Sequence, residues 1–372
     1  MVYVWIALGA LVLVFLFFSF YAFKLGTGRR DRTELFRYSS VAPSARIPFR
    51  DRVEKGVNWF EDQYRETLEI TSDDGLKLKA ELLPCENPKG VIVAMHGFRS
   101  WPSREFALIA KLLYEQGYTV LYPYQRAHRL SQGDYITFGA KEQYDCQQWA
   151  QVLSLRYPEL PLFLYGQSMG ASTVLLAGAL PLPRQIRGLI ADCGYTNPAG
   201  VIRHVLRTAY KVPPYPLLWC MDLWARLLGH YSFYEVNTLA ALDKTSLPCL
   251  FIHGTADDLV PYEMGRANAE RCHTEKDFLT VKDAGHCASW YVGEADYRSH
   301  LLAFLQRPAG GGDPGAGAPR GGGGGPRNSA GGRRPPQACR QARSAPPPFV
   351  YGSAPKNRAP GLFSLTNRPC RL

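Results

Sequence analysis

Three short stretches of this 372-residue chain contain side chains that can act together in nucleophilic catalysis. Ser168 lies in GQSMG, Asp257 in HGTADDLVP and His286 in DAGHC. A serine hydroxyl attacks a carbonyl carbon when a histidine takes its proton, and a carboxylate fixes the tautomer of that histidine. One known type of triad has its members in the chain order Ser, acid, His. We therefore predict that Ser168, Asp257 and His286 are catalytic.

The sequence around Ser168 predicts a sharp turn between a strand and a helix. Gly166 and Gly170 lie two residues to either side of the serine, with an apolar run before them and an alanine-rich stretch after them. Side chains at these two positions would collide with neighbouring backbone in such a turn. A G-x-S-x-G match also fits a glycine-rich turn in which the serine only caps a helix. The motif therefore indicates a catalytic serine only together with a suitable acid and histidine.

Both partners of the serine fall on loops that follow predicted strands. We favour Asp257 over Asp258 as the acid, and His286 follows Asp257 by 29 residues. Loops at the carboxyl ends of the strands form the sites of open α/β sheets. A solvated pair of aspartates and a hydrogen-bonded structural histidine are the alternatives. For the oxyanion hole we predict the backbone N–H groups of Phe98, in the loop after the third strand, and of Met169.

Short apolar runs alternate with amphipathic stretches from residue 69 to about residue 306, which is the pattern of successive βα units. Asp74-Gly75 is a hairpin signal, so the sheet should open with an antiparallel pair. The predicted fold is α/β, with a mostly parallel sheet, antiparallel N-terminal strands and helices on both faces. Strands are predicted at 76–85, 91–95, 119–124, 162–166, 189–192, 249–254 and 278–281. Helices are predicted at 103–116, at 140–155, from 168 onwards and at 295–305.

An insert at about 195–243 interrupts this alternation with a stretch rich in proline and aromatic residues. We predict that it forms a small helical cap over the site, and ordinary surface helices are the alternative. An apolar cap above a pocket would favour a small-molecule substrate with an acyl or other apolar group.

The N-terminal segment has no charged residue from Val2 to Phe23. As a helix, this segment is about 33 Å long, close to the hydrocarbon thickness of a bilayer. We predict a transmembrane anchor over residues 1–24, followed by a juxtamembrane linker and leading helix over 25–65. A cleaved signal peptide is the alternative, but its basic start, shorter apolar stretch and cleavage site are not evident.

Basic residues follow this segment and predict its orientation. The positive-inside rule places such a flank in the cytoplasm, so we predict a single-pass membrane protein with a cytoplasmic catalytic domain. The flank consists of Lys24, Arg29, Arg30 and Arg32.

The formal charge of +11 comes almost wholly from the C-terminal tail. Residues 307–372 hold eleven Lys and Arg and one acidic residue, so residues 1–306 are nearly neutral. Fourteen Gly and twelve Pro in this tail, with almost no apolar periodicity, predict disorder. A basic arm for acidic lipid or RNA is the functional alternative to a solvated extension. The domain itself does not predict a nucleic-acid partner.

The nine cysteines are widely spaced and include no C-x-x-C pair. In a chain of this size they indicate free thiols in a reducing compartment rather than a disulfide framework. The sequence predicts no metal site, no cofactor and no obligate protein partner.

With HGF after a strand, GQSMG, HGTADDLVP and AGH, residues 66–306 resemble the α/β-hydrolase superfamily. The anchor, the ADCGYT stretch and the aromatic insert are similar to those of membrane-anchored bacterial hydrolases of the serine aminopeptidase-like and esterase-like kinds. This resemblance implies a Ser-Asp-His mechanism without a cofactor. Relatives often carry Arg-Gly-His-Gly-x-Ser where this chain has QRAHRLSQG. Arg126 and His128 could therefore contact substrate at the rim or only support the loop.

The predicted function is that of a membrane-anchored, carboxylesterase-like serine hydrolase that cleaves an ester or related acyl bond through an acyl-enzyme. Acyl thioesters and peptide or amide bonds are the alternatives among substrates, since the same triad can cleave them. A membrane-anchored binding module that keeps the fold without the activity is the alternative outside enzymes.

Overall fold

The computed structural model describes residues 1–29 and 44–307. The predicted disordered tail therefore lies outside the described residues except for Arg307, and so do Arg30 and Arg32 of the basic flank. Seven of the nine cysteines are described, and all seven are free thiols.

An eight-stranded sheet in the order β1-β2-β4-β3-β5-β6-β7-β8 forms the centre of the domain. β2 is antiparallel to both of its neighbours, and the other neighbouring pairs are parallel. This arrangement confirms the predicted fold class. The strands are β1 (Glu66–Thr71), β2 (Lys77–Leu83), β3 (Gly90–Met95), β4 (Tyr118–Pro123), β5 (Leu162–Gln167), β6 (Ile186–Asp192), β7 (Cys249–Gly254) and β8 (Lys276–Val281).

The sequence of each strand fits its place in the sheet. β3, β4, β5 and β7 consist wholly of buried residues, as expected for strands covered by helices on both faces. β1, at the edge, alternates between half-buried and exposed residues. The predicted hairpin joins β1 to β2, and Gly75 in its turn adopts φ +84°, a conformation that glycine reaches without a steric penalty.

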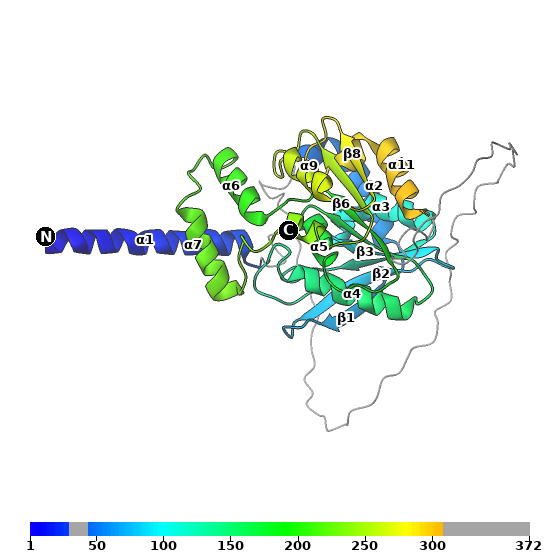
Figure 1. Ribbon diagram of the computed structural model, residues 1–372, viewed down its shortest axis with the longest axis horizontal. Helices are drawn as coiled ribbons and strands as arrows, with labels where there is room; N and C mark the ends of the chain where they lie inside the picture. Colours follow the sequence, from blue (N-terminus) through cyan, green and yellow to red (C-terminus); the bar gives the residue numbers. More distant parts are fainter. Residues whose placement is uncertain (30–43, 308–372) are drawn as a thin grey trace, which may run out of the picture. The chain divides into compact units, whose positions relative to one another are not determined.

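Helices cover both faces of the sheet (Figure 1). Phe60, Phe106 and Tyr297 anchor one layer through one buried cluster, and Trp149 and Val174 anchor the other. Burying each such side chain stabilises the fold by about 1.5–3 kcal/mol. The first layer contains α2 (Arg50–Glu61), α3 (Pro102–Glu115) and α11 (Glu294–Leu305). The second contains α4 (Glu142–Arg156), α5 (Met169–Ala177), α8 (Thr238–Leu242) and α9 (Tyr262–Arg271). Two further short helical segments are η2 (Ser44–Phe49) and α10 (Ser289–Val292).

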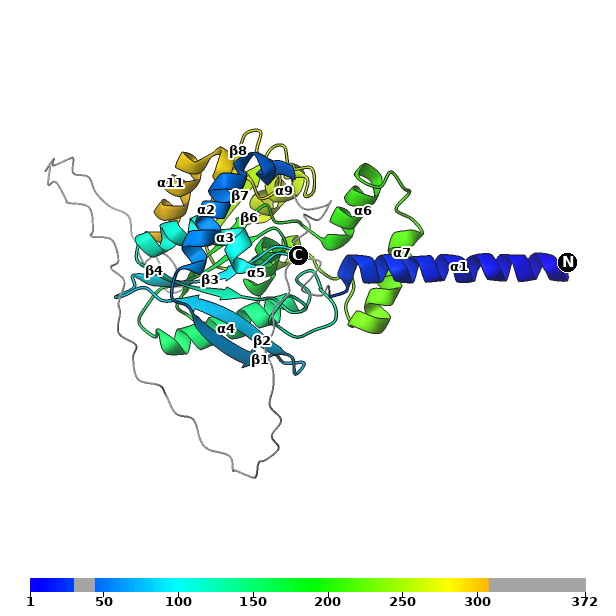
Figure 2. The same cartoon turned by 180° about the vertical axis from the view of Figure 1, so that it is seen from behind.

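The insert between β6 and β7 is helical. Asn197 caps its first helix by accepting a hydrogen bond from Gly200 N at 2.7 Å. The chain then leaves the sheet and returns to it at α8, which packs against α5 and α9. The helices that stand away from the sheet are α6 (Pro198–Thr208), α7 (Leu217–Trp224) and the π-helix η3 (Ala225–Gly229) (Figures 1 and 2).

The N-terminal helix α1 (Val2–Thr27) continues past the predicted end of the apolar span. It is long and apolar enough to cross a membrane, although a signal sequence would pass the same test. Its residues up to Val14 are exposed, whereas Ser19, Phe23 and Thr27 are buried one turn apart. The buried stripe packs against α7 of the insert. α1 is therefore joined to the rest of the domain by side-chain packing as well as by the chain.

Candidate active site

Ser168 lies in a strained turn between β5 and α5. Its backbone has φ 55° and ψ −116°, a combination that is unusual for a residue with a side chain. A side chain on Gly166 would put its Cβ 2.1 Å from the carbonyl oxygen of Gly170, and one on Gly170 would lie 1.9 Å from that of Met95. Both contacts are to backbone, which cannot move aside cheaply. The two glycines therefore allow β5 and α5 to meet closely enough to present Ser168.

The structure brings Ser168, His286 and Asp257 together from three separate loops. Ser168 Oγ donates a hydrogen bond to His286 Nε2 at 2.8 Å, and His286 Nδ1 donates to Asp257 Oδ2 at 2.7 Å. All three residues are buried. The three loops follow β5, β7 and β8 at the carboxyl ends of parallel strands, where open α/β sheets form their sites.

The electrostatic environment favours a charged pair of His286 and Asp257. Burial on its own would raise the pKa of Asp257, but the charge on His286 and hydrogen bonds from two histidines outweigh it, so this pKa lies well below its usual range. Burial on its own would lower the pKa of His286, but the Asp257 carboxylate outweighs it and raises that pKa well above the usual value. Asp257 thus stabilises the imidazolium that forms when His286 accepts a proton.

The second carboxylate oxygen of Asp257 organises its own loop. Asp257 Oδ1 accepts hydrogen bonds from Leu259 N at 3.0 Å and from Val260 N at 2.9 Å. His253 Nε2 lies 3.3 Å from Asp257 Oδ2. Asp258 is exposed. Of the two adjacent acids, Asp257 is the one held in a fixed orientation beside His286.

The predicted oxyanion donors lie on two sides of Ser168. Met169 is the first residue of α5, where backbone N–H groups have no partner within the helix. Phe98 follows Gly97 in the loop after β3, and a Cβ placed on Gly97 would lie 3.3 Å from Ser168 Cβ. This loop therefore passes directly beside the serine. The side chains packed around both residues are apolar, since Met169 and Phe98 belong to one cluster with Tyr195 and Val236.

Known proteins match this chain over most of the domain. Residues 86–233 match the family of serine aminopeptidases S33. The uncharacterised protein YqkD of Bacillus subtilis strain 168 is 28% identical over 248 residues, which cover 66% of this chain and 81% of that protein. The uncharacterised protein YfhR of Escherichia coli strain K12 is 23% identical over 248 residues, covering 64% of this chain and 80% of that protein.

Solved structures share the fold. An esterase of Pyrococcus furiosus, Pf2001, superposes with a TM-score of 0.54 at 24% identity, covering 69% of this chain and 94% of that one. The acylaminoacyl peptidase of Pyrococcus horikoshii gives a TM-score of 0.52 at 15% identity, covering 70% of this chain and 45% of that one. The sheet order and these matches indicate the same fold. The chain has the α/β-hydrolase fold. The proteins that it matches include hydrolases of the esterase and peptidase kinds.

Two residues at the rim of this α/β-hydrolase have structural partners. Arg126 donates to Asp145 through Nε and through Nη2, both at 2.7 Å, and through Nη1 to Asp74 at 2.8 Å. His128 Nε2 accepts from Arg99 N at 3.0 Å, and burial keeps the pKa of His128 well below the usual value. These contacts correspond to the supporting role, which was one of the two alternatives for Arg126 and His128.

Sequence reasoning did not identify Arg46, which reaches the loop of His286 from the leading segment. Arg46 Nε donates to the carbonyl oxygen of Cys287 at 3.0 Å, and its Nη2 pairs with Glu105 at 3.3 Å. The contact joins residues 241 positions apart. No local pattern predicts such a pair, because it depends on how η2 packs against the far end of the chain.

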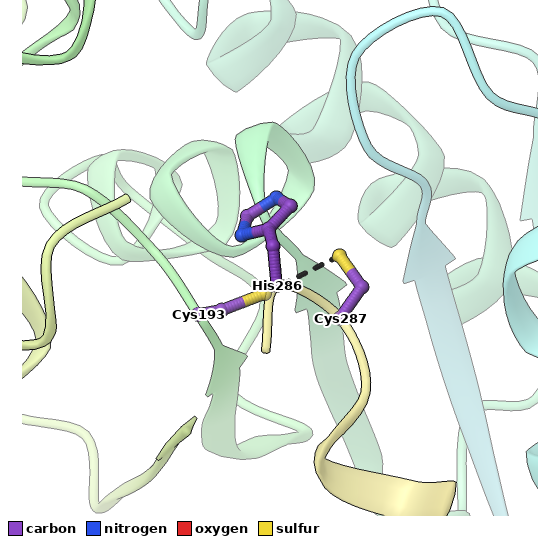
Figure 3. A group of neighbouring side chains, drawn as sticks. All are labelled: Cys193, His286 and Cys287. Atoms are coloured by element: carbon purple, nitrogen blue, oxygen red, sulfur yellow. Dashed lines mark hydrogen bonds between the residues drawn. The ribbon is translucent and has the colours of Figure 1, made fainter. Parts of the chain in front are cut away.

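Sequence reasoning also missed two thiols beside His286. Cys193, directly after β6, and Cys287, directly after His286, have their sulfur atoms 3.4 Å apart (Figure 3). Their sulfur atoms and one nitrogen of His286 lie within 4.8 Å of one another, a set that could hold a thiophilic cation. Both nitrogens of His286 already bind Asp257 and Ser168. A cation there would therefore compete with the triad rather than assist it.

Proposed function

We propose that this α/β-hydrolase is a membrane-anchored serine hydrolase that cleaves a carboxylic ester or a related acyl bond. The unbroken line of hydrogen bonds from Ser168 through His286 to Asp257, at 2.8 and 2.7 Å, carries this proposal. Such a line is the arrangement that nucleophilic catalysis by serine requires.

In the proposed reaction, His286 Nε2 takes the proton of Ser168 Oγ as that oxygen attacks the acyl carbon. Asp257 Oδ2 stabilises the resulting imidazolium through Nδ1–H. The N–H groups of Phe98 and Met169 receive the oxyanion. His286 then protonates the leaving group as its bond to the acyl carbon breaks. A water oxygen attacks the acyl-enzyme as His286 takes its proton, the bond to Ser168 Oγ breaks, and His286 returns the proton to Ser168 as the carboxylic acid is released.

α1 supplies the membrane part of the proposal. An uncleaved helix that spans the bilayer would hold the domain at the surface, and the basic flank after it favours the cytoplasmic side. The apolar cluster beside Ser168 favours an apolar acyl group in the substrate. Peptide or amide cleavage is the second candidate, because residues 86–233 match serine aminopeptidases.

The test is hydrolysis by the purified full chain, with and without Ser168→Ala, of matched ester, thioester and aminoacyl amide substrates. We expect the variant to lose at least about 10³-fold in kcat on each substrate that the native chain cleaves. Retained hydrolysis in the variant would contradict the role of Ser168, and the preferred substrate separates the esterase from the peptidase.

A further inference from the structure

The insert exposes a row of apolar side chains. Trp219, Leu223 and Leu227 are 60%, 46% and 56% exposed, and they follow one another at intervals of four residues along α7 and η3. Tyr210 and Val212, just after α6, are exposed as well. Burying one apolar side chain is worth about 1.5–3 kcal/mol, so an exposed row of this kind indicates a surface with a partner.

The opposite side of α7 packs on the apolar helix α1. The ring of Trp224 lies 5.3 Å from that of Phe20, and Trp224 Nε1 donates a hydrogen bond to Ser19 Oγ at 3.0 Å. Met221 and Phe23 lie in the same buried cluster. α7 therefore carries apolar side chains both on the side that contacts the predicted membrane helix and on its exposed side.

If α1 spans the bilayer, the contact of Trp224 with Ser19 gives the depth of α7 in it. Ser19 precedes Lys24, the first charged residue after the apolar span, by five residues, or about 7.5 Å along a helix. Amphipathic helices at membrane interfaces lie about 5–10 Å deep. α7 also runs across α1 rather than along it in both views (Figures 1 and 2). If α1 spans the bilayer, α7 lies along the membrane plane at the interfacial depth.

The charges of the insert suit an anionic lipid surface. Glu235 is its one exposed acidic residue between residues 198 and 237, since Asp222 is buried. Lysine and arginine near a membrane surface each contribute about 1 kcal/mol of attraction to anionic lipid. The exposed basic residues of the insert are Arg203, Arg207, Lys211 and Arg226, of which Arg226 pairs with Asp222 and Glu235.

Apolar contacts lead from α1 to the serine. Phe23 shares a cluster with Phe233, whose ring lies 5.8 Å from that of Phe138. Phe138 in turn stacks on Phe98 at 5.4 Å, and Phe98 lies in the loop beside Ser168. Packed aromatic side chains thus link the cluster around α1 to the loop that passes beside Ser168.

We propose that α6, α7 and η3 lie in the membrane leaflet beside α1, and that the site takes a lipid ester whose acyl chain reaches Ser168 from the bilayer. The lipid-ester substrate rests on the proposed function. The embedding of the insert in the membrane does not, so the two parts of the proposal can fail separately.

Membrane contact can be measured on the full chain in vesicles of phosphatidylcholine and phosphatidylglycerol. Lipids brominated near the headgroup end of the acyl chain quench nearby tryptophans. We expect Trp219→Phe to remove a quenched component of the fluorescence, whereas Trp149→Phe, which replaces a buried ring on α4, removes an unquenched one. Equal quenching of both components would overturn the embedding of the insert, whether or not the protein is an enzyme.

The substrate route needs a matched pair of variants. Leu223→Gln with Leu227→Gln places amides in the row, and Leu155→Gln changes a side chain on α4 that is 83% exposed. In the vesicles, we expect the double variant to hydrolyse a bilayer-embedded long-chain ester at least tenfold more slowly and a short water-soluble ester at the native rate. Leu155→Gln should change neither rate. Equal losses on both esters, or no loss, would overturn the route.

A second, independent observation concerns Cys193 and Cys287. Their sulfur atoms are 3.4 Å apart, and both residues are buried and adopt positive φ, 49° and 55°. A disulfide requires the sulfurs to approach to about 2.05 Å. Cys287 is bonded directly to His286, so this movement would shift the base relative to Ser168, and displacements of about 1 Å can cost 10²-fold in rate.

We propose that this pair is a site of reversible oxidation by hydrogen peroxide, which is small enough to reach a buried thiol. The Cys287 thiolate attacks one peroxide oxygen, and the O–O bond breaks to give a sulfenic acid and, after proton uptake, water. The Cys193 sulfur then attacks the sulfenic sulfur and releases a second water. Two thiols and one peroxide thus give one disulfide and two waters. The hydrogen bond with Cys193, together with the charge on His286, lowers the pKa of Cys287 and supports its role as the first nucleophile.

The test treats the full chain with peroxide and follows both peptide mass and ester hydrolysis. We expect a disulfide-linked Cys193 and Cys287 peptide pair, loss of activity, and recovery of activity with dithiothreitol. Cys193→Ser should keep the basal activity before oxidation and yield no linked peptide pair, because the Cys287 sulfenic acid then has no second thiol to form the disulfide with. Cys85→Ser, which removes a thiol in the loop after β2, should behave like the native chain. Absence of the linked peptides would overturn the site independently of any activity.

Discussion

At the scale of single residues, Asp257 has two tasks that one substitution can separate. Its Oδ2 faces His286, while its Oδ1 holds the loop through Leu259 and Val260. Asp257→Asn keeps an oxygen for the loop but removes the charge that stabilises the imidazolium. We expect kcat for the ester to fall about 10⁴-fold with little change in unfolding temperature. Asp258→Asn, at the exposed neighbour, is the control and should leave kcat within twofold; equal effects would contradict the choice of acid.

The raised pKa of His286 predicts the pH dependence of the reaction. Below this pKa the imidazole is protonated and cannot accept the proton of Ser168, so kcat/KM should rise with pH. Because Asp257 raises the pKa above the usual value of about 6.5, the midpoint of the rise should lie above that pH. Asp257→Asn should move the midpoint of its residual activity to lower pH. A midpoint that the substitution leaves unchanged would show that another group controls the rate.

The three triad residues were predictable because each follows a strand with a recognisable pattern. Parallel strands deliver their following loops to one edge of the sheet, so sequence order and local pattern suffice to predict proximity. The contacts of Arg46, His253 and Cys193 were not predictable in this way. Their contacts arise from how distant segments pack, and nothing in their local sequence distinguishes them from ordinary surface or core residues.

At the scale of elements, the turn between β5 and α5 depends on glycine. A Cβ on Gly170 would lie 1.9 Å from the carbonyl oxygen of Met95, so β3, β5 and α5 would have to separate. We expect Gly170→Ala to destabilise the protein by about 3 kcal/mol or more. Gly26→Ala in α1 places its Cβ 3.6 Å from Met221, an ordinary contact, and should be neutral or stabilising. Thermal unfolding followed by near-UV circular dichroism compares the two variants. Equal unfolding temperatures would contradict the close approach of Gly170 to the backbone of Met95.

The strands and helices that were given ranges lie where they were expected, with small errors at their ends, but β1 was implied only by the hairpin signal and α9 was not predicted. The end of α1 was not predicted either, because hydropathy marks where a helix is apolar and not what it packs against. The helix continues to Thr27, whose carbonyl oxygen accepts a hydrogen bond from Ile136 N at 2.7 Å. Ser19, Phe23 and Thr27 form the packed stripe, and this stripe is indistinguishable by hydropathy from the exposed side of a helix that is apolar all round.

At the scale of the whole molecule, the basic flank after α1 predicts a cytoplasmic domain. Protease added to intact cells stripped of their wall should then leave the chain whole, and lysis should expose the tail to cleavage beyond residue 307. Cleavage of the tail in intact cells would reverse the predicted orientation. The formal charge of +11 does not indicate a nucleic-acid partner for the domain, since residues 1–306 are nearly neutral.

The central claim is that Ser168 is a nucleophile activated by His286, in a chain with an α/β-hydrolase fold. A fluorophosphonate forms a stable bond only with such a serine, and mass spectrometry of the labelled full chain identifies the residue. We predict a single adduct on Ser168 of the native chain, at least tenfold slower labelling of His286→Ala, and none on Ser168→Ala. An unlabelled native chain, or an adduct on any other residue, would contradict the account.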